Sequence, residues 1–106
     1  MKKKKMENIK AEYGSIKFFK IKEASFNIET ILPKKKLPEV YLKRNKAMLM
    51  VLEGILHTPI GKMKKDEIVT IKPKERFWLE NKSNKKAVFL AVDIPPIREK
   101  DIVWVR

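Results

Sequence analysis

The chain has 106 residues, 43% of them hydrophobic, and carries a formal charge of +13. This length fits one compact domain, and the absence of cysteine excludes disulfides, a cysteine-bound zinc and a cysteine nucleophile and favours the cytoplasm. No apolar run approaches the roughly 18 residues of a membrane span, and no apolar segment follows the basic residues 2–5, so we expect neither a membrane protein nor a signal peptide.

The N-terminal end is the most basic part of the chain. Residues 2–5 are four consecutive lysines, and like charges in a run repel one another and disfavour folded structure. Residues 1–11 are the only segment that could be helical. We therefore expect residues 1–12 to form a flexible basic segment in front of a single domain at residues 13–106.

The rest of the chain reads as short strands separated by polar turns. Apolar and polar residues alternate at period two or form short apolar runs, and such segments recur at the spacing typical of an all-β sandwich or closed barrel. Residues 33–38 are bracketed by prolines, which cannot donate to a ladder, so we expect a basic loop there. Residues 47–52 are apolar on both faces, which predicts a strand buried on both sides. The expected strands are 16–22, 26–32, 39–44, 47–52, 55–59, 67–71, 77–81, 87–92 and 102–105.

The positive charge has two explanations. Lysine and arginine that neutralise phosphates give strong nucleic-acid binding. However, 22 of the 26 basic residues are lysine, glutamine is absent and isoleucine is abundant, which is also the composition of a thermophilic protein. The excess is uneven, since residues 1–46 carry 14 basic and 5 acidic residues. We favour the thermophilic explanation and keep nucleic-acid binding as an alternative.

The order of short motifs between residues 39 and 96 resembles that of the cupin superfamily. The resemblance implies an all-β fold, a single-domain double-stranded β-helix of the jelly-roll type. The motifs, in chain order, are VLEG (51–54), a loop ending at Asp66, IKP (71–73), WLEN (78–81) and IPP (94–96).

The family's metal ligands do not accompany this pattern. Its motifs are G-x5-H-x-H-x3-4-E-x6-G and G-x5-P-x-G-x2-H-x3-N. If Gly54 closes the first motif, Ala47 stands where the glutamate belongs, and Tyr41 and Lys43 stand at the histidines. In the second motif Phe77 replaces the histidine, and the closing asparagine is Asn81. The chain has a single histidine, which cannot build a three-histidine site elsewhere, so we expect no metal and no cofactor.

The same alignment indicates where a ligand could bind. Strand alternation places Phe77 and Asn81 on the inner face, and it places Tyr41 and Lys43 there together. These four residues are the candidate ligand contacts, with Lys43 suited to an anionic group. His57 is the candidate catalytic residue, because only histidine titrates near neutrality when unperturbed. Four of these five residues have a structural alternative: Phe77 can fill the core, Tyr41 can be a half-buried strand residue, and His57 and Lys43 can lie on the solvent face.

Three functions follow from this reading. The first is a metal-free barrel that binds a small polar or anionic ligand, such as a carbohydrate or metabolite, without turnover. The second is a metal-independent sugar or sugar-nucleotide isomerase or epimerase acting through His57. The third is nucleic-acid binding, which needs Phe18, Phe19, Tyr41 and Trp78 on one open face. Whether the protein is an enzyme stays open. We also expect a homodimer with the outward-facing Trp78 as an anchor.

Overall fold

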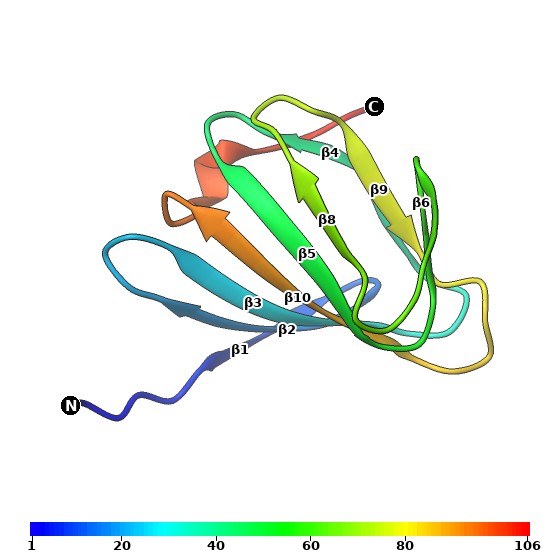
Figure 1. Ribbon diagram of the computed structural model, residues 1–106, viewed down its shortest axis with the longest axis horizontal. Coiled ribbons are helices and arrows are strands. Elements are labelled where there is room, and N and C mark those ends of the chain that lie inside the picture. The colour runs from blue at the N-terminus through cyan, green and yellow to red at the C-terminus, as the bar shows by residue number, and fades with distance from the viewer.

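Two antiparallel sheets face each other in the structure, a computed structural model that describes all of residues 1–106 (Figure 1). One sheet has the strand order β1-β2-β3-β10-β5-β8, and the other has the order β11-β4-β9-β6-β7. The all-β, single-domain architecture expected from the sequence is confirmed. The strands are β1 (Glu7–Ala11), β2 (Gly14–Lys20), β3 (Ser25–Ile31), β4 (Lys36–Leu42), β5 (Lys46–Glu53), β6 (Leu56–Thr58), β7 (Gly61–Met63), β8 (Ile68–Ile71), β9 (Phe77–Glu80), β10 (Ala87–Ile94) and β11 (Ile102–Trp104).

Helical structure is almost absent. The one helical element, the 3-10 turn η1 (Glu99–Asp101), has three residues, and no helix of the structure could span a membrane.

The N-terminal segment differs from expectation, because part of it is a strand. β1 pairs with β2 in antiparallel register from Glu7 opposite Phe18 to Ala11 opposite Gly14. Tyr13, in the turn between the two strands, is buried. The expected helix or flexible segment is therefore wrong for residues 7–11, where pairing to β2 satisfies the backbone polar groups that a flexible segment would leave to water. The folded domain begins at β1 and not at residue 13.

β4 also begins earlier than expected, inside the predicted loop at residues 33–38. Its register against β9 shifts between Leu37 and Val40, so the strand is irregular around Pro38. On its other side, β11 pairs only with the three residues from Val40 to Leu42. No strand pairs with Pro38 on that side. The missing N–H of the proline therefore breaks no hydrogen bond of the sheet there, and the proline is tolerated in this strand.

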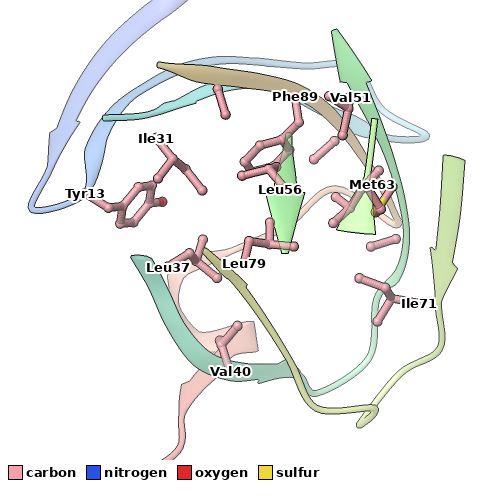
Figure 2. Packing of buried hydrophobic residues seen from close by; sticks show 14 of the residues in the cluster. Tyr13, Ile31, Leu37, Val40, Val51, Leu56, Met63, Ile71, Leu79 and Phe89 are labelled. Atoms are coloured by element: carbon pink, nitrogen blue, oxygen red, sulfur yellow. The ribbon is translucent and has the colours of Figure 1, made fainter. Parts of the chain in front are cut away.

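Inward-facing side chains of both sheets form the hydrophobic core (Figure 2). Phe89 and Val51 from one sheet point toward Leu56 and Leu79 from the other, and all four are almost fully buried. Burial of each such side chain stabilises the fold by about 1.5–3 kcal/mol. These residues belong to the hydrophobic core, and some of them, such as Leu79 and Phe89, also line a cavity inside the barrel.

The larger sheet is apolar on its outer face as well. Successive residues of a strand point to opposite faces, and on β3, β10 and β5 the outward residues are hydrophobic except for Thr30 and Lys46. Residues 47–52 were expected to be buried on both faces of their strand. This expectation is wrong for the single chain, because Met48 on the outer face is 42% exposed. Two adjacent rows define this outer apolar face: Phe26, Val92 and Met48 in one, and Ile28, Leu90, Met50 and Ile68 in the other.

A buried carboxylate ties the C-terminal segment to the β4–β5 loop. Asp101 is 1% exposed, and its Oδ1 accepts hydrogen bonds from Arg44 Nε and from Arg98, both at 3.0 Å. The Arg98 backbone N–H donates to the other oxygen at 2.9 Å. Hydrogen bonds from Arg98, with those from Arg44, hold the pKa of Asp101 well below its usual range.

The substitution Asp101→Asn should destabilise the protein by about 1–3 kcal/mol at pH 7, because the two arginines lose the negative charge with which they pair and an amide nitrogen, which cannot accept a hydrogen bond, replaces one carboxylate oxygen. The folded-state pKa of Asp101 is depressed, so its contribution is complete above the unfolded pKa near 4 and is lost as pH falls further. Urea unfolding should therefore show the difference from wild type shrinking between pH 5 and pH 2. The exposed neighbour Glu99→Gln is the control, and an equal effect of both substitutions would contradict the assignment.

Candidate ligand-binding cavity

A cavity of about 740 Å³ lies between the two sheets. Its walls come from both sheets and are mostly hydrophobic, with 16 hydrophobic residues among the 23 that line it. The volume lies within the range of about 300–1,000 Å³ that is typical of small-ligand sites.

The exposed lining residues show where the cavity opens. Glu7 and Ile9 lie on β1, and Lys20 is the last residue of β2. The others are near the C-terminus: Arg98 directly precedes η1, Glu99 is its first residue, and Trp104 is the last residue of β11. All six are solvent-exposed, and Trp104 is 50% exposed. The mouth is therefore the gap between the β1–β2 edge of one sheet and the C-terminal edge of the other.

A line of polar side chains runs along the inner face of β3. Because strand residues alternate between faces, Ser25, Asn27 and Glu29 share the inner face with Ile31. Asn27 and Glu29 line the cavity. On the neighbouring strand β10, Asp93 is paired with Ser25 and also lines the cavity.

Glu29 is the most deeply placed acid of this line. It is 7% exposed, and its Oε1 accepts a hydrogen bond of 2.7 Å from the Tyr13 hydroxyl. Burial raises the pKa of Glu29 to about 7, although the Tyr13 hydrogen bond opposes this shift. Burial, and then the charge of Glu29, also raise the pKa of Tyr13 above its usual range. Near neutral pH, Glu29 is thus present in both protonation states and can donate or accept a proton.

Two further polar groups complete the line. Burial raises the pKa of Asp93 to about 6, and the Ser25 hydroxyl approaches its carboxylate at 3.5 Å. The Ser25 hydroxyl in turn accepts a hydrogen bond of 2.9 Å from the Ile97 backbone N–H. The Asn27 Oδ1 atom is buried and has no hydrogen-bond partner. The cavity therefore presents three acceptors from two adjacent strands.

Two of the residues predicted from the sequence to bind ligand point inward. Phe77 lines the cavity. Asn81 is fully buried, but its side chain holds the turn before β10 together: Nδ2 donates to the carbonyls of Ile31 at 2.9 Å and Lys85 at 2.7 Å, and Oδ1 accepts from Ser83. The hydrogen-bonding atoms of Asn81 are thus already used within the protein.

Tyr41, Lys43 and His57 lie elsewhere. Tyr41 stands between Val40 and Leu42, which both line the cavity, so it points away from it. Lys43 is exposed beyond the end of β4. The expected position of these two residues on the inner face is therefore wrong, because an error of one residue turns a whole strand over.

His57, the predicted catalytic residue, is half-buried on β6 opposite Lys62 and Glu80, and it does not line the cavity. Its neighbours Leu56 and Thr58 are the buried residues of this short strand.

The aromatic residues invoked for nucleic-acid stacking do not share one face either. Phe18 lines the cavity, whereas Phe19 lies on the opposite face of β2 and stacks on Phe26 at 6.1 Å between ring centroids. Trp78 is half-buried on the other sheet, with the Lys36 ammonium 4.9 Å from its ring centroid.

The sequence did contain a signal for the polar line that was missed. Residues 25–29 read Ser-Phe-Asn-Ile-Glu, a strict alternation of polar and apolar residues. An alternation says that two faces differ but not which of them is inside, and the usual assumption places the apolar face inward. In this strand the polar face is the inner one.

No family model matches the sequence, and no curated protein matches it. Solved structures are similar to it. The crystal structure of TT1209 from Thermus thermophilus has 15% identity and a TM-score of 0.70, with 88% of this chain and 86% of that chain covered. An uncharacterised conserved protein with a double-stranded β-helix domain from Klebsiella pneumoniae has 15% identity and a TM-score of 0.72, with 94% and 85% covered.

Oxalate decarboxylase from Bacillus subtilis superimposes with a TM-score of 0.81 at 12% identity, over 93% of this chain but only 30% of that one. The chain has the cupin fold. At these identities the likeness extends to the fold alone, so the activity of the larger enzyme is not transferred by it.

The cupin fold also corrects the positions of the missing metal ligands. The family motif allows three or four residues between the second histidine and the glutamate, and with four the histidine positions fall on Val40 and Leu42. These two residues line the cavity together with Ala47 and Phe77, so all four ligand positions meet there. None of the four can coordinate a metal, and no group of three or more His, Cys, Asp or Glu side chains could hold one. The residues do not fit the metal centre of the cupin motifs.

The substitution Glu29→Gln should stabilise the protein by about 2 kcal/mol at pH 8 and change little at pH 4. Burial raises the pKa of Glu29 from 4.5 to about 7 in the folded state. Between these two pH values the folded state binds more protons than the unfolded state, so the free energy of unfolding falls as pH rises. Urea unfolding at both pH values measures this, with the exposed Glu23→Gln as control. A destabilisation of equal size at both pH values would contradict the raised pKa of Glu29.

Proposed function

We propose that this protein uses its cupin fold to bind a small organic ligand rich in hydrogen-bond donors, such as a carbohydrate or a related metabolite. The cavity supports this proposal through its size, its apolar walls and the acceptor groups of Asn27, Glu29 and Asp93. A few polar groups in an otherwise apolar cavity are the usual composition of a small-ligand site.

The observation that carries the proposal is the unpaired Asn27 Oδ1. A buried acceptor without a partner costs about 1–3 kcal/mol, and this one belongs to a residue that lines the cavity beside Glu29. A hydroxyl or amino group of a ligand would supply the missing donor and recover this energy.

The charges favour a ligand that is not an anion. Lys43, which was expected to hold an anionic group, lies outside the cavity, and the inner groups Glu29 and Asp93 are acidic. An anion placed next to them would raise the cost of ionising both carboxyls.

A second candidate function is proton transfer on the bound ligand, as in an isomerase or epimerase. His57 cannot perform it from outside the cavity, but Glu29 combines a cavity position, a Tyr13 partner at 2.7 Å and a pKa of about 7. These are the properties of a general acid or base near neutral pH. Binding without turnover needs fewer assumptions and remains the main proposal.

Filling the cavity tests the proposal. Ala91 lies opposite Asn27 on the inner face of β10, so Ala91→Phe should occupy the ligand space and reduce binding at least tenfold. The matched control is Val88→Phe, which adds its bulk on the outer face of the same strand. Saturation-transfer NMR with a panel of monosaccharides, polyols and amino sugars measures binding. Failure of wild type to bind any member at millimolar concentration, or equal binding by Ala91→Phe, would contradict the proposal.

A further inference from the structure

The charge inside the cavity is opposite in sign to that of the whole chain. The molecule carries +13, yet the charged cavity residues are four acids, Glu7, Glu29, Asp93 and Glu99, and two bases, Lys20 and Arg98. Both bases are exposed at the mouth, whereas Glu29 and Asp93 are buried. The interior is therefore acidic and has no basic side chain of its own.

Neither inner carboxyl is paired with a cation of the protein. The ion pairs of the structure join Arg44 and Arg98 to Asp101, and Arg76 to Glu39. Arg98, the base at the mouth that could have turned inward, is held by Asp101 at 3.0 Å. Two buried carboxyls without a counter-charge are unusual, because buried acids are ordinarily paired.

The cavity walls suit an organic cation. Five aromatic side chains contribute to the lining: Tyr13, Phe18, Phe77, Phe89 and Trp104. Aromatic faces attract ammonium groups, and the attraction grows when the cation is shielded from water.

We propose that the ligand of this cavity is a small organic amine, bound with its ammonium group at the Glu29 and Asp93 side of the cavity and its apolar body against the aromatic walls. This inference rests on the proposed function and names the chemical class of its ligand. The ammonium group supplies the missing counter-charge for the carboxyls and a donor for the free Asn27 oxygen.

Binding of this kind should depend on pH. In the protein without ligand, burial raises the pKa values of Glu29 and Asp93 to about 7 and about 6. The other titratable groups facing Glu29 are Tyr13, which stays protonated, and the mouth residues Glu7, Lys20, Arg98 and Glu99; β4, β9 and β11 contribute none. A cation favours the ionised carboxyls, so amine binding should release protons and tighten from pH 5 to pH 8.

The test uses three probes of one shape: benzylamine, benzyl alcohol and benzoate, which are positive, neutral and negative at pH 8. Amide chemical shifts of the full chain, followed by NMR titration, should show benzylamine binding at least tenfold more tightly than benzyl alcohol, and no benzoate binding. The benzylamine affinity should fall at least fivefold at pH 5 and at least tenfold in Glu29→Gln. The exposed Glu23→Gln is the matched control and should bind like wild type.

The outcomes separate the inference from the proposed function. Equal or tighter binding of benzyl alcohol or benzoate would overturn the amine while leaving a ligand-binding cavity. A benzylamine affinity unaffected by Glu29→Gln would also overturn it, and because this variant gains stability at pH 8, misfolding would not explain a loss. If neither these probes nor the earlier panel perturbs the cavity, the proposed function fails as well.

Discussion

The orientation of β3 is the constraint on which the rest of the structure depends. β3 lies between β2 and β10 and turns Ser25, Asn27 and Glu29 inward. The backbone of β3 approaches Gly14 at the start of β2 so closely that a Cβ atom on Gly14 would lie 1.8 Å from the Thr30 carbonyl oxygen. Only glycine therefore fits at this point of the β2–β3 pairing. The hydrogen bond from Tyr13 to Glu29 links the same turn to the same strand. These contacts give the cavity its polar line and the outer face its apolar surface.

The cavity lacks the ligand chemistry of the cupin metal motifs. Val40, Leu42, Ala47 and Phe77 stand at the ligand positions of the motifs and present only hydrocarbon. The polar groups of the cavity lie on β3 and β10, where burial raises the pKa values of two carboxyls. In a low-dielectric cavity such carboxyls are weak acids that take up and release protons near neutral pH, and the proposed amine binding and proton transfer both rest on this property.

The C-terminal segment shows how the mouth of the cavity is kept in shape. Asp101 draws Arg98 and Arg44 toward the end of β4, while the Asn45 side chain donates to the Pro95 carbonyl at 2.7 Å. These contacts place η1 and Trp104 across the opening from β1 and β2. They also occupy Arg98, which leaves the inner carboxyls without a basic partner.

The sequence by itself determined the all-β class and most strand positions, because alternation, turn residues and motif order are local properties of the chain. Phe77, which the motif alignment put on the inner face, lines the cavity. β1 was missed, because its stability comes from pairing with β2 and not from its own composition. The tertiary structure alone decided which face of each strand points inward. An alternating pattern has no absolute direction, and a shift of one residue exchanges the faces, as at Tyr41 and Val40. The acidic cavity and the exposed apolar face could be seen only once sheet pairing had assigned Glu29 to the interior and Ile28 to the surface.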